Sequence, residues 1–218
     1  MIEAFIFDMD GVITDTVGYH CQSWQVIADR EGWEFDDKIN EKLLGLTRVD
    51  SLKQIMVHND LQLSQEEMDA ICKEKNDNFV KMIDAMSESD LLPGIKQLLL
   101  TLKKCGYKLS VASASKNAPL VLKSIGIDGL FDNISDSSHV KRGKPAPDVF
   151  LHAAARLGVK PENCVVFEDA VAGVEAALAA GMHVVGIGDK AALYRADCVY
   201  ASPLDVDLEE ILNKVQNR

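Results

Sequence analysis

The chain begins with a short apolar run that ends at an acidic position. Residues 4–7 read Ala-Phe-Ile-Phe, and Asp8 follows them directly. A continuous apolar run of this length is typical of a strand that is buried on both faces of a parallel sheet. We therefore predict a central strand over residues 4–7, with an aspartate at its carboxyl end.

Beyond this strand, the apolar positions of residues 15–89 follow helical spacing. Positions such as Trp24 and Ile27 recur three and four residues apart, and no strand-like run interrupts them. Ser64 and Glu67 have the spacing of a capping box at the start of a helix. The pattern predicts an all-helical block, inserted after the first strand.

Helical and strand-like patterns alternate in the part of the chain that follows. Helices of about ten residues between short apolar runs are typical of right-handed crossovers that join parallel strands. We predict strands at residues 109–112, 133–135, 164–167 and 184–187, and helices at residues 95–102, 117–125, 147–157 and 171–180.

The predicted fold class is α/β, a Rossmann-like parallel-sheet core domain with an inserted all-α cap domain. The core comprises residues 1–14 and 90–218, and the cap comprises residues 15–89. Because the insertion leaves the sheet just after the first strand, it lies over the carboxyl ends of the strands, where open α/β sheets bind ligands. We expect the cap to act as a lid over a binding site.

The composition and net charge of the chain limit the kinds of molecule that it can bind. The 218 residues are 47% apolar and 26% charged, which is ordinary for a folded domain. The formal net charge is −11, the wrong sign for binding nucleic acid or an anionic membrane through a general positive field. We expect neither partner, and any anionic substrate must be bound by local cations or a metal.

Cysteine usage and the first residues bear on location. The five cysteines are scattered and form no C-x-x-C pair, so neither a disulfide framework nor a zinc site is predicted. The first residues lack the basic segment and the long apolar run of a signal peptide or membrane span. We expect a cytoplasmic protein, and the high net charge without an exposed apolar stripe favours a monomer.

Two acidic pairs follow predicted strands. Asp8 and Asp10 leave the first strand, and Glu168 and Asp169 leave the strand at residues 164–167. Grouped at one edge of the sheet, these carboxylates repel one another unless a cation lies among them. Hard oxygen ligands in this number suit Mg²⁺. We predict a magnesium site; the alternative is that each acid is only a helix cap or loop residue.

Cations and hydroxyl groups near other strand ends indicate anion sites. Lys144 precedes a helix that starts with proline, and it supplies a cation beside the predicted metal. Ser113 ends a strand, and Ser115, Lys116 and Asn117 follow at a helix start, where free N–H groups favour anions. We expect one phosphate at Ser113 and Lys144 and a second at the other three residues. A surface lysine and an ordinary N-cap are the alternatives.

The segments that carry these residues resemble the motifs of the haloacid dehalogenase superfamily, and specifically of its β-phosphoglucomutase branch. The motifs are, in chain order, FIFDMDGVITDT, SAS, GKP and FEDAVAG. The resemblance extends into the predicted cap through LTRVDSL and KNDNFVKMI, so it covers nearly the whole chain. It implies a small helical cap on an α/β core.

The resemblance also implies a role for each matching position of the core. Asp8 would be the nucleophile that carries a phosphoryl group, and Asp10 would be the general acid and base. Ser113 and Lys144 would bind the transferring phosphoryl group. The implied Mg²⁺ ligands are Asp8, the backbone carbonyl of Asp10, Glu168 and Asp169.

For the cap and the substrate, the resemblance implies a hinge and two sets of binding residues. Thr16 would lie at the hinge. The substrate's second phosphate would be held by Arg48, Ser115, Lys116 and Asn117. The remaining substrate-binding positions would be His20, Trp24, Gly45, Lys75 and Ala114.

The implied activity is the interconversion of β-D-glucose 1-phosphate and glucose 6-phosphate. It would proceed through an aspartyl-phosphate enzyme, with β-glucose 1,6-bisphosphate as primer and intermediate. Cap closure around a bound phosphate would exclude water from the phospho-aspartate. The chain departs from the branch in the cap loop, where Leu44 stands in place of the usual lysine before a glycine.

Three other kinds of protein fit part of the sequence pattern. A sugar-phosphate phosphatase of the same fold would use the same core motifs and let water attack the phospho-aspartate. A dehalogenase needs no Mg²⁺ and has little use for the pair Glu168 and Asp169. A non-catalytic receiver domain would carry its aspartate on a later strand and would have no cap. We predict a mutase, with the phosphatase as the alternative.

Overall fold

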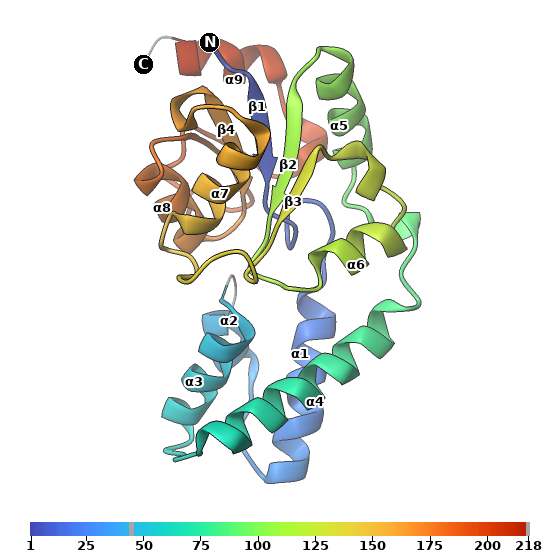
Figure 1. Ribbon diagram of the computed structural model, residues 1–218, viewed down its shortest axis with the longest axis vertical. Coiled ribbons are helices and arrows are strands. Elements are labelled where there is room, and N and C mark those ends of the chain that lie inside the picture. Colours follow the sequence, from blue (N-terminus) through green and yellow to red (C-terminus); the bar gives the residue numbers. More distant parts are fainter. Residues whose placement is uncertain (44–45, 217–218) are drawn as a thin grey trace.

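A computed structural model describes residues 1–43 and 46–216 of the chain. Its described residues form a six-stranded parallel sheet in the order β3-β2-β1-β4-β5-β6 (Figure 1). The strands are β1 (Ala4–Phe7), β2 (Lys108–Ala112), β3 (Asn133–Ser135), β4 (Cys164–Glu168), β5 (His183–Ile187) and β6 (Cys198–Tyr200).

Strand β1 lies in the middle of the sheet because it is apolar on both faces. Phe5 pairs with Leu109 of β2 and with Val165 of β4. Phe5 and Phe7 pack into one hydrophobic cluster, whereas Ala4 and Ile6 of the same strand pack into a second cluster on the opposite face. The predicted central strand and the α/β fold class are confirmed.

Five α-helices of the described chain cover the two faces of the sheet and pack into these clusters (Figure 1). The first cluster takes residues from α5 (Ile95–Lys104), α6 (Ala118–Ser124) and α9 (Leu208–Gln216), and it also includes Phe79 and Ile83 from the end of α4 (Gln65–Ile83). The second takes residues from α7 (Asp148–Leu157) and α8 (Val171–Ala179). Short 3₁₀ helices lie at Glu88–Asp90, Asp128–Leu130, Pro161–Asn163 and Pro203–Asp205.

Four further α-helices of the described residues lie between β1 and α5, and we call them the cap. They are α1 (Val17–Glu31), α2 (Asp37–Leu43), α3 (Arg48–His58) and α4 (Gln65–Ile83). The cap has its own hydrophobic cluster, which includes Trp24, Ile39 and Leu52. Ser64 and Glu67 form the predicted capping box at the start of α4.

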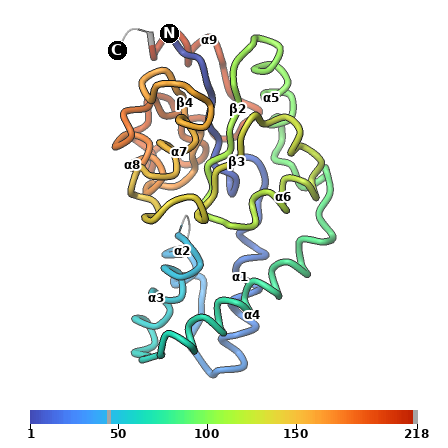
Figure 2. The backbone as a smooth tube through the Cα atoms, viewed as in Figure 1, coloured from blue at the N-terminus to red at the C-terminus, as the bar shows by residue number. Residues whose placement is uncertain are grey.

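The chain crosses between the cap and the α/β core twice, once before α1 and once after α4 (Figure 2). The two crossings are bonded to each other. The Thr14 hydroxyl donates to the Asp90 carbonyl at 2.6 Å, and the Leu92 amide donates to the Ile13 carbonyl at 2.9 Å. Because both crossings meet at one place, the cap is attached to the core at a single narrow joint.

The cap and the core also touch at a point away from this joint. A Cβ atom built on Gly143, in the core loop before α7, would lie 2.9 Å from Cγ2 of Thr47 at the start of α3. The absence of a side chain at Gly143 therefore lets α3 approach the loop that carries Lys144.

None of the helices within residues 1–43 and 46–216 combines the length and the apolar character that a membrane crossing requires.

Candidate active site

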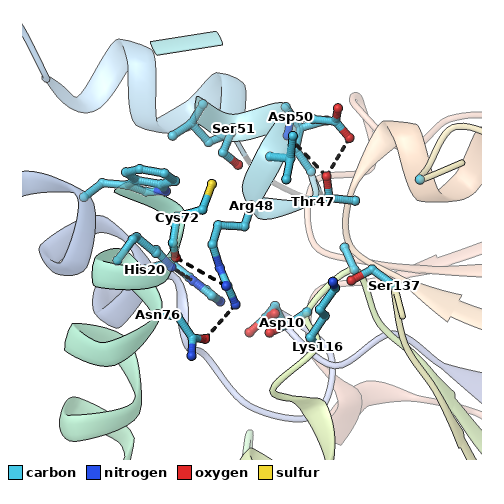
Figure 3. Close-up of a pocket in the computed structure, with 18 of the residues that line it drawn as sticks. Asp10, His20, Thr47, Arg48, Asp50, Ser51, Cys72, Asn76, Lys116 and Ser137 are labelled. Atoms are coloured by element: carbon cyan, nitrogen blue, oxygen red, sulfur yellow. Dashed lines mark hydrogen bonds between the residues drawn. The ribbon is translucent and has the colours of Figure 1, made fainter. Parts of the chain in front are cut away.

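A cavity of about 660 Å³ lies between the cap and the carboxyl ends of the strands. Its walls come from the cap helices and from loops that follow β1, β2, β3 and β4. Figure 3 shows side chains from both parts of the molecule converging on it. The predicted site residues that line it are Asp8, Asp10, His20, Trp24, Arg48, Lys75, Ala114, Ser115, Lys116 and Asp169.

Other predicted residues are hydrogen-bonded to side chains or backbone groups of this wall. The bonded pairs are Thr16 with Asp10, Ser113 with Ser115, Asn117 with Asn76, and Lys144 with Asp8. Glu168 is bonded in turn to Lys144. Leu44 and Gly45, which the sequence placed in the cap loop, lie outside the described residues.

Three of the predicted acidic residues form a compact cluster. Carboxylate oxygens of Asp8, Glu168 and Asp169 lie within 4.8 Å of one another. Lys144 Nζ lies 2.5 Å from Asp8 Oδ1 and 2.5 Å from Glu168 Oε1, and its side chain is 1% exposed. One buried cation thus faces three carboxyl groups.

The charge balance of this cluster favours an added cation. Burial raises the pKa of Asp8 to about 7, against the lowering effect of Lys144, and burial and Glu168 raise the pKa of Asp169 to about 9. Burial opposes the charge of Lys144, but Asp8 and Glu168 outweigh burial and raise its pKa overall. Since one lysine leaves the cluster short of positive charge, and all the ligand atoms are hard oxygens, the residues fit Mg²⁺.

Asp10 is set apart from the three clustered carboxylates. Its carboxylate accepts a hydrogen bond from the buried hydroxyl of Thr16, the residue before α1. Burial raises the pKa of Asp10 to about 6, and the bond from Thr16 partly opposes this shift. A carboxyl group with a pKa near neutrality can both donate and accept a proton during turnover.

Two glycines make room for the acidic cluster. A Cβ on Gly11, which has a φ of +76°, would lie 1.9 Å from Asp169 Oδ2. A Cβ on Gly173, in the first turn of α8, would lie 1.7 Å from Glu168 Oε1. These two glycines of the first and fourth motifs are therefore required by the positions of the two carboxylates.

On the cap side, a buried lysine lies among aromatic rings. Lys75 Nζ lies 2.5 Å from His20 Nδ1 and 4.7 Å from the centroid of the Phe79 ring. Burial and Arg48 lower the pKa of Lys75 to about 7, and burial and Lys75 lower the pKa of His20. An uncharged His20 accepts a hydrogen bond from Lys75, so the pair brings at most one positive charge to this wall of the cavity.

Arg48 stands at the first turn of α3 and reaches toward α4 (Figure 3). Its guanidinium group donates to the Cys72 carbonyl at 3.3 Å and to Asn76 Oδ1 at 2.6 Å. Thr47 fixes this turn because its hydroxyl accepts from the Asp50 amide at 3.2 Å. Across the cavity lies Lys116 of the core.

Asn76 was not among the residues predicted from the sequence. It lies beside Lys75 on α4 and lines the cavity. The only sequence signal for it is its place in a polar stretch, KNDN, within an otherwise amphipathic helix. Composition alone assigns such a stretch to solvent.

The family model for haloacid dehalogenase-like hydrolases matches residues 2–181. The chain belongs to the haloacid dehalogenase-like hydrolase family. The predicted family is thus confirmed, and the motifs that carried the resemblance lie within the matched segment.

Two relatives within this hydrolase family cover nearly the full chain. A β-phosphoglucomutase from Bacillus subtilis is 40% identical over 95% of this chain and 93% of its own length. A phosphorylated carbohydrates phosphatase from Thermotoga maritima is 31% identical over 97% of each chain.

A solved structure gives the same picture of the hydrolase fold. The crystal structure of β-phosphoglucomutase from Clostridium difficile has a TM-score of 0.96 and 42% sequence identity, and the match covers 100% of this chain and 98% of that one. The core and the cap are therefore shared as one arrangement.

Proposed function

We propose that this protein is a Mg²⁺-dependent β-phosphoglucomutase. It interconverts β-D-glucose 1-phosphate and glucose 6-phosphate through a phosphoryl group on Asp8 and through β-glucose 1,6-bisphosphate. The observation that carries the proposal is the cavity, which has the acidic cluster in one part of its wall and the cations Arg48 and Lys116 in another. The similarity to β-phosphoglucomutases over nearly the whole chain supports this choice of substrate.

The carboxyl groups of Asp8 and Asp10 divide the reaction into two transfers. In one transfer, from β-glucose 1,6-bisphosphate, a carboxylate oxygen of Asp8 forms a bond to phosphorus as the bond from phosphorus to the sugar oxygen breaks, and Asp10 donates a proton to that oxygen, which leaves a glucose monophosphate. In the other transfer, Asp10 takes the proton of the free hydroxyl of β-glucose 1-phosphate, and this oxygen attacks the phosphoryl group on Asp8 and forms the bisphosphate again. The covalent step replaces one difficult displacement with two easier ones.

The groups around Asp8 hold the transferring phosphoryl group. Lys144, already 2.5 Å from Asp8 Oδ1, is placed to bond its oxygens, and Ser113 lies at the end of the neighbouring strand. Mg²⁺, when bound, supplies positive charge that stabilises the equatorial oxygens of the phosphoryl group in the transition state. We assign its ligands as Asp8, the backbone carbonyl of Asp10, Glu168 and Asp169.

The remaining predicted residues bind the distal phosphate and the sugar. The distal phosphate takes hydrogen bonds from Arg48 of the cap and from Ser115, Lys116 and Asn117 of the core. The sugar lies against His20, Trp24 and Lys75, with Ala114 on the core side. Because Thr16 links the Asp10 carboxylate to the start of α1, we propose that Thr16 couples cap movement to the general acid.

A sugar-phosphate phosphatase is the alternative, and the 31% identical phosphatase from Thermotoga maritima favours it. The core residues serve both activities, since only the acceptor of the phosphoryl group differs. An assay with Mg²⁺, β-glucose 1-phosphate and a trace of β-glucose 1,6-bisphosphate distinguishes them. Glucose 6-phosphate formed without matching phosphate release supports the mutase, whereas phosphate release alone identifies a phosphatase.

The proposed substrate bears on the cellular location of the protein. Sugar phosphates are held inside cells by their charge, which supports a cytoplasmic protein with reduced cysteines. We propose that the protein acts as a monomer, because its formal net charge of −11 opposes the association of copies.

Replacing Arg48 with alanine is expected to separate the two classes of substrate. A charged hydrogen bond to the distal phosphate would be lost, so kcat/KM for β-glucose 1-phosphate should fall roughly 10- to 100-fold. Hydrolysis of p-nitrophenyl phosphate, which has no second phosphate, should change much less. Arg30→Ala, at an exposed cap arginine, is the control. Equal losses with both substrates would contradict the assigned role.

The stabilising effect of Mg²⁺ is expected to grow with pH. Since the pKa values of Asp8 and Asp169 lie above their ordinary value of 3.8, the metal-free folded protein retains protons that the unfolded chain has lost. These groups therefore make the metal-free protein less stable as pH rises from about 4 to about 9. Mg²⁺ removes this penalty by favouring the ionised carboxylates.

Thermal unfolding measures this effect directly. At 100 times its Kd, Mg²⁺ adds about 2.7 kcal/mol, or roughly 5–10 °C in Tm for a chain of this size. We expect the difference in Tm between Mg²⁺ and EDTA to be larger at pH 8 than at pH 5.5. A difference that is equal at both pH values would argue against a metal bound by these carboxylates.

A further inference from the structure

We infer that Asn76 is a positioning residue that links the cap to the core before substrate binds and holds Arg48 ready for the distal phosphate. Asn76 Oδ1 accepts a hydrogen bond from Arg48 Nη2 at 2.6 Å and another from Asn117 Nδ2 at 2.9 Å. Arg48 and Asn76 belong to the cap, whereas Asn117 belongs to the core. One amide oxygen thus joins donors from both sides of the cavity.

Arg48 is held from two points of a single helix. Cys72 and Asn76 lie four residues apart on α4, so the backbone carbonyl of the first and the side chain of the second occupy one face. Both accept from the guanidinium group, at 3.3 Å and 2.6 Å. Without Asn76, Arg48 would retain only the longer of these two bonds.

The two donors that meet at Asn76 are donors of the kind that a phosphate needs. A phosphate oxygen accepts hydrogen bonds from guanidinium and amide N–H groups, as the amide oxygen of Asn76 does here. In the substrate-free protein Asn76 therefore aims Arg48 and Asn117 at one point. When phosphate binds, Asn117 can exchange one acceptor for another, and Arg48 remains oriented by Asn76.

The neutrality of Asn76 matters for this role. A carboxylate at the same position would accept from the same two donors more strongly, but it would repel the incoming phosphate. An alanine would repel nothing, but it would leave Arg48 poorly oriented and the cap without this bond to the core. Asn76→Ala therefore tests the loss of the hydrogen bonds between cap and core, and Asn76→Asp tests the effect of a negative charge on phosphate binding.

The experiment measures Asn76→Ala and Asn76→Asp in the full-length protein. Asn78→Ala is the matched control, because Asn78 is two residues along the same helix and its buried amide nitrogen has no hydrogen-bond partner among the described residues. Three properties are measured: KM and kcat for β-glucose 1-phosphate, hydrolysis of p-nitrophenyl phosphate, and the radius of gyration without substrate by small-angle X-ray scattering.

The expected pattern differs between the two variants. Asn76→Ala should raise KM for β-glucose 1-phosphate roughly tenfold, with a smaller change in kcat, and should increase the radius of gyration. Asn76→Asp should also raise KM, but it should keep the radius of gyration of the unsubstituted protein. Hydrolysis of p-nitrophenyl phosphate should change less than KM for β-glucose 1-phosphate in both, and Asn78→Ala should match the unsubstituted protein throughout.

The role of Asn76 in binding rests on the proposed mutase function, and the scattering measurement keeps the two claims separate. If the unsubstituted protein does not isomerise β-glucose 1-phosphate, the proposed function fails, and the bridge is still judged from the radius of gyration of Asn76→Ala. If the unsubstituted protein is a mutase and Asn76→Ala retains both its KM and its radius of gyration, the inference is wrong.

Discussion

Replacing Asp8 with asparagine is expected to abolish phosphoryl transfer and to leave the fold intact. Asparagine has the shape of aspartate but cannot form the acyl-phosphate bond, so kcat should fall by roughly 10⁴-fold or more. Burial already opposes the charge of Asp8, as its raised pKa shows, so removal of that charge should not destabilise the protein. Lys144 keeps its second partner, Glu168.

The test of Asp8→Asn combines kinetics with a direct view of the intermediate. The unsubstituted protein, quenched in acid during turnover, should show by mass spectrometry a fraction heavier by one phosphoryl group. Asp8→Asn should show none, whereas Asp29→Asn, at an exposed cap position, should behave as the unsubstituted protein does. Turnover by Asp8→Asn at a tenth of the normal rate would rule out Asp8 as the nucleophile.

Replacing Gly173 with alanine is expected to disable the site although no charged residue is substituted. The new Cβ would lie 1.7 Å from Glu168 Oε1, so the carboxylate must move and its 2.5 Å contact with Lys144 must break. We expect Mg²⁺ affinity to fall at least roughly tenfold, as when a group that orients a metal site is lost. Overpacking should lower the free energy of unfolding by about 1–3 kcal/mol.

Gly18→Ala is the matched control for Gly173→Ala. Both glycines lie in the first turn of an α-helix, but a Cβ on Gly18 meets nothing within 4 Å. Helix propensity alone predicts that replacing glycine with alanine in a helix raises the free energy of unfolding by about 1 kcal/mol. The two variants should therefore shift the unfolding free energy in opposite directions. A stabilised and fully active Gly173→Ala would show that Glu168 does not need its present position.

The sheet and most of its helices could be predicted because buried segments leave a periodic signal. The expected helix at residues 95–102 and strand at residues 164–167 agree with α5 and β4 to within two residues. Among the α-helices and strands of the described residues, β6 and α9 had no prediction: β6 has three residues at the edge of the sheet, and α9 follows it near the end of the described chain. Within the predicted helical block, α2 was not distinguished as a separate helix, because it is seven residues long and mostly polar. The short elements α2 and β6 bury too few side chains to show a period. Helix α9 does carry a helical period, at Leu208, Ile211, Leu212 and Val215, which the prediction did not use.

The grouping of the core site residues could be predicted from the ends of the strands, whereas the positions of the cap residues could not. Asp8 and Glu168 could be placed together because parallel strands end at one edge of a sheet, and the structure brings them into one cluster. The carboxylate of Asp10 was expected in that group, but it turns to Thr16 instead. Cap positions such as Arg48 were indicated only by the resemblance to the family, because local sequence patterns do not determine which face of a cap helix is turned toward the core.

The contact between Thr47 and Gly143 has a consequence for how caps and cores are combined. A methyl group on the cap meets a missing side chain on the core loop, so the two positions form a matched pair, one large and one small. An engineer who transplants a cap between relatives must carry this pair across intact or invert it, for example by serine at residue 47 when residue 143 gains a side chain. A cap can therefore be exchanged between relatives only if its atoms fit the core at this contact, which lies away from the joint where the two parts would be connected.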